Sequence, residues 1–182
     1  MEDWQASKNE DREADSQKWI LIQHRTGQEE GPFEENGWQG YKDGFGSEEG
    51  NYWIGLERLH DITSQGSWEL YISVRYNPNG VAFLTCNNFR VESEWEHYGL
   101  IIDSCDNLRS TSSFYMDLPK AFEALNTALF TTKDKDNDKL DVYNCAVAKR
   151  GGFWYNHEES CMRYFPPTGN LWHEAKMAIR PA

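Results

Sequence analysis

The residues in this sequence best suited to bind a metal ion are carboxylates at alternate positions, Asp134, Asp136 and Asp138. Carboxylates spaced in this way within a polar segment can bring several hard oxygen ligands to one point, which is what calcium requires. The helix-flanked calcium loop is excluded, because its Gly and Glu positions hold Lys139 and Cys145. A solvated acidic turn without metal is the alternative, since Asp favours turns in any case. The spacing alone leaves both interpretations open.

Local patterns predict the elements that must position these carboxylates. The segment 130–132 favours extended chain, and Asp, Asn, Gly, Pro and aromatic residues dominate after it, as expected for a site built from loops. Alternation of apolar and polar residues predicts a half-buried strand over 68–76. The other predictions are a strand over 19–25, a helical or turn segment over 38–50, an amphipathic helix over 52–60 entering 61–63, a turn at 77–80, a hairpin-like pairing of 81–91 with 98–103, and a short helix over 121–129.

Length and charge limit the class of protein. The 182 residues correspond to about one domain, and the net charge of -12 argues against nucleic-acid binding, which relies on Lys and Arg. Much of the negative charge lies in 2–15 and at 29–35, so residues 1–17 are predicted to form a disordered acidic tail. The longest apolar runs, such as 19–22, are too short for membrane insertion. The N-terminus lacks the pattern of a signal peptide.

Cysteine and histidine residues offer few further sites. The four Cys fit two disulfides in a secreted protein and allow three pairings. His157 and Cys161 would share one face of a helix, but two ligands are too few for a zinc site. Gly44 and Gly46 lack the third Gly of a nucleotide-binding loop. The five His are scattered, and nothing in the sequence indicates acid-base or nucleophilic catalysis.

Five blocks of sequence, in order, resemble the fibrinogen-related domain, the C-terminal globe of fibrinogen chains, ficolins, tachylectins, tenascins and angiopoietins. The blocks are WILIQHR, GWQGYKDGFGSEEGNYWIGLERLHDIT, FTTKDKDNDKLDVYNCA, RGGFWYN and KMAIRPA. The resemblance implies an α+β fold over 18–182 with a central twisted antiparallel sheet and short helices. It divides this range into a central sheet part (18–129), a loop-rich lobe with a calcium ion and a ligand pocket (130–176), and a strand that returns to the sheet (177–182).

The resemblance also implies particular site residues. It assigns the calcium ligands to the carboxylates of Asp136 and Asp138, with carbonyls near Leu140 and Val142, and Asp134 is a further candidate. The spacing from Asp138 to Cys145 is one residue longer than in many relatives. The ligand pocket would be lined by Trp154, Tyr155, Asn156, His157 and Tyr164. An alternative for Trp154 is that its ring packs in the core.

The resemblance further implies a disulfide between Cys145 and Cys161. This bridge would close a loop of about fifteen residues and contribute about 3 kcal/mol in the chain-entropy model. Cys86 and Cys105, on strands joined by a turn at 92–96, would then be either bridged or free thiols. Both states remain open.

Two functions of different classes follow. The first is a secreted, calcium-stabilised lectin-like protein that binds acetylated sugars or microbial surface glycans. The second is a protein-interaction module of the matrix or receptor-ligand type without sugar binding. The sequence after Cys161 lacks the Asn-Leu-Asn-Gly segment of relatives, which favours the second, whereas Trp154 to Asn156 favour the first. Relatives form oligomers through segments that this chain does not contain.

Overall fold

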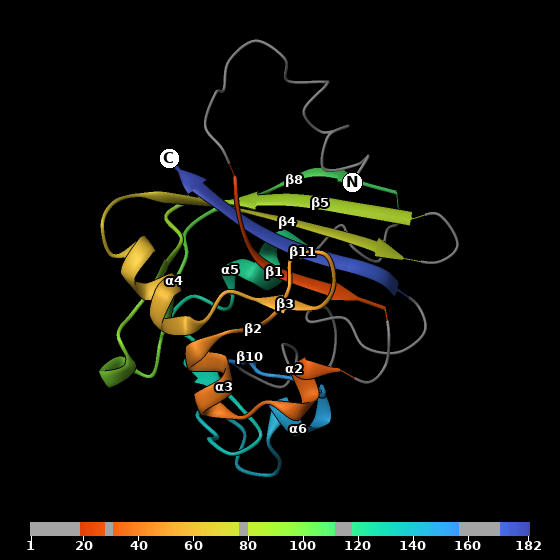
Figure 1. The fold of residues 1–182 in the computed structure, drawn as a ribbon. Helices are drawn as coiled ribbons and strands as arrows, with labels where there is room; N and C mark the ends of the chain where they lie inside the picture. Colours follow the sequence, from red (N-terminus) through yellow and green to blue (C-terminus); the bar gives the residue numbers. More distant parts are fainter. Residues whose placement is uncertain (1–18, 28–30, 77–79, 112–117, 157–171) are drawn as a thin grey trace.

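Figure 1 shows the computed structural model, which describes residues 19–27, 31–76, 80–111, 118–156 and 172–182. The fold is α+β, as predicted, and is built around one large antiparallel sheet. The strands of this sheet are β1 (Ile20–Thr26), β2 (Phe45–Gly46), β3 (Tyr52–Trp53), β4 (Trp68–Tyr76), β5 (Gly80–Cys86), β8 (Cys105–Ser110) and β11 (Trp172–Pro181). Two smaller sheets pair β6 (Arg90–Val91) with β7 (Leu100–Ile101) and β9 (Phe130–Thr131) with β10 (Phe153–Trp154). The helices are α2 (Pro32–Glu35), α3 (Trp38–Asp43), α4 (Leu56–Thr63), α5 (Leu118–Glu123) and α6 (Cys145–Ala148), with a 3-10 turn η1 (Glu94–Glu96).

The strand β11 lies in the middle of the large sheet, between β1 and β4 (Figure 1). The strand order is β2-β3-β1-β11-β4-β5-β8, and Met177 of β11 lies opposite Ile72 of β4 and Gln23 of β1. The prediction that 177–180 returns to the central sheet is therefore confirmed. The strand is longer than predicted, because its pairing with β4 already begins at Trp172.

The strand β4 has the bounds that the sequence pattern predicts. Leu70, Ile72 and Val74 are buried, whereas Arg75 is exposed. Successive side chains of a strand point to opposite faces, so the apolar set of β4 faces the core.

The predicted helix over 52–60 begins later than expected. Tyr52 and Trp53 form β3, which pairs with β1 and β2, and the helix α4 starts at Leu56. Gly55 separates the two elements with a φ of 99°, and an added Cβ would lie 2.9 Å from the carbonyl carbon of Asp43. Only glycine adopts this backbone conformation without strain. The amphipathic pattern continues across this break and therefore conceals it.

Two other predictions are corrected. The pairing of 81–91 with 98–103 is right only for β6 and β7, because β5 pairs with β8, which lies beyond the predicted range. The left-handed backbone of Asn88, with a φ of 53°, lies between β5 and β6. The helix predicted over 121–129 is α5, which begins at Leu118 and ends at Glu123, and turns follow it. The predicted turn at 77–79 lies outside the described residues, as do 1–17.

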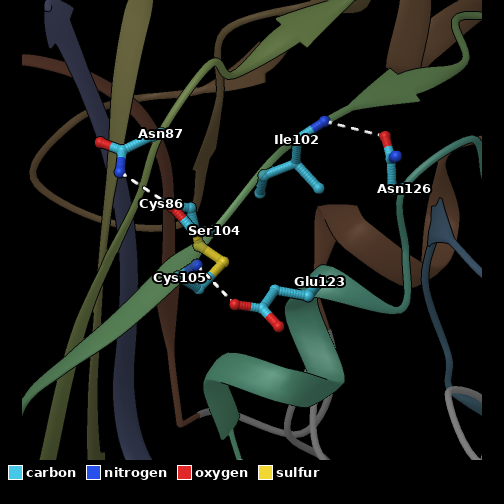
Figure 2. The surroundings of a disulfide bond; sticks show 7 residues. All are labelled: Cys86, Asn87, Ile102, Ser104, Cys105, Glu123 and Asn126. Carbon is cyan, nitrogen blue, oxygen red and sulfur yellow. Dashed lines mark hydrogen bonds between the residues drawn. A yellow bond between two sulfur atoms is a disulfide. The ribbon is translucent and has the colours of Figure 1, made fainter.

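A disulfide joins Cys86 of β5 to Cys105 of β8 (Figure 2). The two residues lie directly opposite each other in the sheet, with Cα atoms 4.0 Å apart. The backbone N–H of Cys105 donates a hydrogen bond of 2.7 Å to the Glu123 carboxylate of α5. Of the two states left open by the sequence, the bridged one is formed. The bridge joins β8, the last strand in the sheet order, to β5, and the hydrogen bond to Glu123 connects α5 to β8.

Aromatic side chains join the sheet to the loop-rich lobe. Phe130 of β9 packs edge-on against Trp154 of β10, with ring centroids 5.0 Å apart, and stacks on Trp53 of β3 at 6.0 Å. The hydroxyl of Tyr41 donates to the Phe33 carbonyl at 2.7 Å. These rings are almost fully buried, so the lobe and the sheet share one hydrophobic core.

Candidate functional site

The acidic run of the lobe forms a tight turn directly after β9. The backbones of Thr132 and Lys135 bond to each other in both directions, at 2.9 and 3.2 Å. The side chain of Asn137 donates to the Phe130 carbonyl at 2.7 Å, and its backbone N–H donates to the Thr131 hydroxyl at 3.2 Å. Because Phe130 and Thr131 are buried, these bonds hold the polar turn firmly on the aromatic core.

Asp134 connects this turn to the start of α3. Its Oδ1 accepts hydrogen bonds of 2.8 Å from the Trp38 backbone N–H and the Thr132 hydroxyl. Burial alone would raise the pKa of Asp134, but these hydrogen bonds more than offset it and lower the pKa. An added Cβ on Gly37 would lie 2.4 Å from the other carboxylate oxygen, so the two segments pack closely. These contacts give Asp134 a structural role, and its role as a calcium ligand stays a prediction.

Asp136 and Asp138 lie next to each other, as a cation site requires. The backbone N–H of Asp138 donates to Asp136 Oδ1 at 3.3 Å. The two oxygens of Asp138 each accept a 2.8 Å bond, Oδ1 from the Leu140 N–H and Oδ2 from the Cys145 N–H. Burial, followed by the charge of Asp138, raises the pKa of Asp136. A cation between the two carboxylates would relieve this repulsion.

The residues present therefore fit a calcium ion only with help from the backbone. The part of the chain that the structure describes contains no group of three or more His, Cys, Asp or Glu side chains able to hold a metal ion. Carbonyl oxygens and water complete many calcium sites. The side chain of Leu140 packs against the core, and that of Val142 is 87% exposed. Their carbonyls remain predicted ligands.

The lobe is fastened further at α6. The Asn144 side chain accepts hydrogen bonds from the N–H groups of Ala146 and Val147, which caps the helix. Its amide also donates to the Thr132 carbonyl at 2.9 Å. Cys145 is buried and disulfide-bonded. Its expected partner, Cys161, lies outside the described residues.

The predicted ligand pocket is not formed by Trp154 and Tyr155. Trp154 is 0% and Tyr155 1% exposed, and both belong to the hydrophobic core. The indole N–H of Trp154 donates to the Tyr98 carbonyl at 2.7 Å, and the Tyr155 hydroxyl donates to the Gly151 carbonyl at 2.8 Å. The alternative that Trp154 packs in the core is therefore correct, because its ring lies against Trp53 of β3 and Phe130 of β9.

Of the other predicted pocket residues, the structure describes Asn156. The amide of Asn156 donates to the Ala124 carbonyl at 2.7 Å, which fastens the end of β10 to the segment after α5. His157 and Tyr164 lie outside the described residues.

Two buried cations lie behind the lobe. Arg25 is 5% exposed, and its guanidinium carbon lies 4.2 Å from the centre of the Phe33 ring. Lys149 is 8% exposed, and burial, followed by the charge of Arg25, lowers its pKa. Burial lowers the pKa of Arg25, and the hydroxyl groups of Tyr41 and Tyr155 oppose this effect. This arrangement keeps two positive charges in the interior without a neighbouring carboxylate among the described residues.

Trp95, within the predicted turn at 92–96, is a candidate binding residue that the sequence patterns did not indicate. The structure leaves this side chain 93% exposed on η1, beside a groove that also includes Glu94, His97 and Lys135. A signal was present in the sequence, since a Trp between Glu94 and Glu96 in a turn has no apolar neighbours with which to enter a core.

Comparison with known proteins identifies the class of this domain. The sequence profile of the family described as "Fibrinogen beta and gamma chains, C-terminal globular domain" matches residues 9–178. Human tenascin-R is 34% identical over 148 residues, which are 81% of this chain and 10% of tenascin-R. Mouse angiopoietin-related protein 2 is 33% identical over 148 residues, which are 80% of this chain and 27% of that protein. The chain thus spans a small part of these relatives.

Solved structures agree with this assignment. The fibrinogen-like globe domain of human ANGPTL6 superimposes with a TM-score of 0.71 at 29% identity, covering 90% of this chain and 78% of that one. The corresponding domain of human ANGPTL2 superimposes with a TM-score of 0.72 at 28% identity, covering 93% of this chain and 83% of that one. A lamprey fibrin D-dimer, complexed with the peptide ligand Gly-His-Arg-Pro-amide, shares the fold at 22% identity, with a TM-score of 0.68 and coverages of 93% and 63%.

This chain belongs to the fibrinogen C-terminal globular domain family. The resemblance found in the sequence is therefore confirmed, and with it the prediction that the domain is a binding module without enzymatic activity. The relatives are extracellular proteins. Within the described residues, no helix has the length and apolar character needed to cross a membrane.

Proposed function

We propose that this chain is an extracellular protein-interaction domain of the matrix or receptor-ligand type, whose lobe is held in shape by one calcium ion. The proposal is supported by family membership together with the burial of Trp154 and Tyr155. These two rings were the main reason to expect an acetyl-sugar pocket. Since both are used in the core, the surface of the domain is better suited to a protein partner than to an acetylated sugar.

The calcium ion would be held by the carboxylates of Asp136 and Asp138, with carbonyls near Leu140 and Val142. A bound calcium ion supplies a compact double positive charge to hard oxygen ligands. The chain itself presents two adjacent carboxylates that repel each other, and Asp138 also holds the N–H groups of Leu140 and Cys145. These contacts orient the carboxylates and connect the site to α6, so the residues here have a structural rather than a ligand-contacting role.

A calcium titration of the melting temperature tests the ion site. Calcium at about a hundred times its dissociation constant is expected to stabilise the folded chain by about 2.7 kcal/mol. Asp136→Asn is expected to abolish this gain. Asp141→Asn is the matched control, because Asp141 is an exposed carboxylate in the same segment outside the predicted ligand set. A melting temperature that does not respond to calcium would refute the ion site.

Paired arrays test the choice of partner. The labelled chain is applied to an array of extracellular protein domains and to a glycan array, each with calcium and with a chelator. We expect calcium-dependent binding to at least one protein and no binding to acetylated sugars. Chelator-sensitive binding to acetylated sugars alone would overturn the proposal and favour the lectin-like function instead.

A further inference from the structure

The strongest unassigned feature is a groove of about 510 Å³ lined by Glu94, Trp95, His97 and Lys135, here called the Trp95 groove. One wall is the turn η1 between β6 and β7, and the other is the turn after β9. It includes none of the predicted calcium ligands or predicted pocket residues.

The indole of Trp95 is presented to solvent on a rigid support. The Ser93 hydroxyl donates to the Glu96 carboxylate at 2.8 Å, and the backbone N–H of Ser93 donates to the same carboxylate at 3.3 Å. This capping box fixes the short turn that carries Trp95. A rigid ring that is 93% exposed offers a large apolar surface at a small entropic cost, and Trp is enriched among the residues that dominate protein interfaces.

The backbone next to Trp95 is strained in a way that fixes the groove. His97 and Tyr98 have φ values of 53° and 50°, so two successive residues other than glycine are left-handed. This conformation is sterically unfavourable for residues other than glycine. It is maintained by hydrogen bonds from the Phe130 N–H to the His97 carbonyl and from the Trp154 indole to the Tyr98 carbonyl. Strain of this kind is concentrated at binding sites.

The side chain of His97 has an unused polar atom. Its Nδ1 is buried and has no hydrogen-bond partner among the described residues. Because this atom is buried, it lies beyond the reach of a ligand, and His97 contributes to the groove as part of its wall.

The groove contains one lysine, Lys135, and one carboxylate, Glu94. Glu94 is already used, since its carboxylate accepts bonds from the Trp38 indole at 2.9 Å and from Lys42 at 2.5 Å. The ammonium of Lys135 lies 3.7 Å from the centre of the Trp38 ring. The hydrogen bond from Lys42, which forms an ion pair with Glu94, lowers the pKa of Glu94, and the charge of Lys135 contributes to this effect. On a chain with a net charge of -12, this local cation favours a carboxylate from a partner.

We propose that the Trp95 groove binds an acidic peptide segment of a protein partner. An apolar side chain of the segment, such as proline, packs on the Trp95 indole, and an adjacent carboxylate pairs with Lys135. A peptide can supply both groups within a few residues, whereas a neutral sugar offers no charge for Lys135. The inference rests on the proposed function, because it names the partner class and surface of a protein-interaction domain.

The test uses the intact chain and a display library of random peptides. Peptides enriched on the wild-type chain are expected to combine Asp or Glu with a neighbouring proline or aliphatic residue. The affinity of a synthetic copy of the enriched peptide is then measured by calorimetry. Trp95→Ala and Lys135→Glu are each expected to weaken binding by tenfold or more, and higher salt should weaken it further.

Two control variants separate the groove from general surface effects. Leu108→Ala removes an apolar side chain that is 57% exposed on β8, and Lys139→Glu makes the same charge change at an exposed site near Lys135. Both are expected to change the affinity by less than twofold. All variants concern exposed or groove residues, and circular dichroism checks that each is folded.

Failure of the groove assignment can be distinguished from failure of the proposed protein-interaction function. Failure to enrich any peptide, enrichment without acidic residues, or equal affinity of the Trp95→Ala variant would overturn the groove assignment. So would binding of the groove to sugars only. If a protein from the extracellular array binds but is insensitive to Trp95→Ala and Lys135→Glu, the domain is still a protein-interaction module and its contact surface lies elsewhere.

Discussion

Removing the Cys86–Cys105 disulfide should destabilise the domain mainly through the unfolded state. The bridge joins residues 19 apart in sequence, and closing a loop of that length is worth about 3 kcal/mol in the chain-entropy model. Domains are typically stable by about 5–15 kcal/mol, so this is a large fraction. For a chain of this length, the loss corresponds to a fall in melting temperature of about 6–12 °C.

Urea unfolding of the Cys86→Ala, Cys105→Ala double variant measures this quantity. The free energy of unfolding should fall by about 3 kcal/mol, and the urea dependence should steepen because the unfolded chain becomes more expanded. Glu123→Ala is the control, since it removes only the hydrogen bond to the Cys105 N–H and should cost about 1 kcal/mol without changing that slope. A double variant within about 1 kcal/mol of wild type, with an unchanged slope, would refute the reasoning.

Three further predictions concern buried groups. Lys149→Met should raise the free energy of unfolding by about 1 kcal/mol near neutral pH, because burial and the nearby Arg25 disfavour the charged amine. A lower free energy of unfolding for this variant, measured in urea, would contradict this. The hydrogen bond from His24 lowers the pKa of Glu174 to about 2, so this carboxylate stabilises the fold above about pH 5 and loses that effect as the pH falls toward 2. Solvent screening of this partly exposed carboxylate reduces the effect, so Glu174→Gln should cost about 2 kcal/mol at pH 7 and nothing near pH 2, and a cost independent of pH would exclude this cause. Trp154→Phe should cost about 3 kcal/mol, because a buried carbonyl loses its indole donor and a cavity remains, and a melting curve like that of wild type would argue against the packing described.

Some parts of the fold could be predicted because their signals are local. The alternation in 68–76 gives a strand with the observed bounds, since Leu70, Ile72 and Val74 line one fully buried face of β4. The run of Asp134, Asp136 and Asp138 could be recognised as a possible cation site from spacing alone. Other parts depend on distant partners. The pairing of β5 with β8 and the break at Gly55 arise from contacts that no local pattern records.

The sequence by itself determined the family, the α+β class and the position of the acidic turn, because ordered blocks of residues and their spacing are preserved along the chain. The tertiary structure alone decided how each aromatic and carboxylate is used. Trp154, for example, is buried in the core and not in a ligand pocket. The physical reason is that burial depends on which distant elements pack over a side chain, and the Trp154 indole lies against Trp53 of β3 and Phe130 of β9.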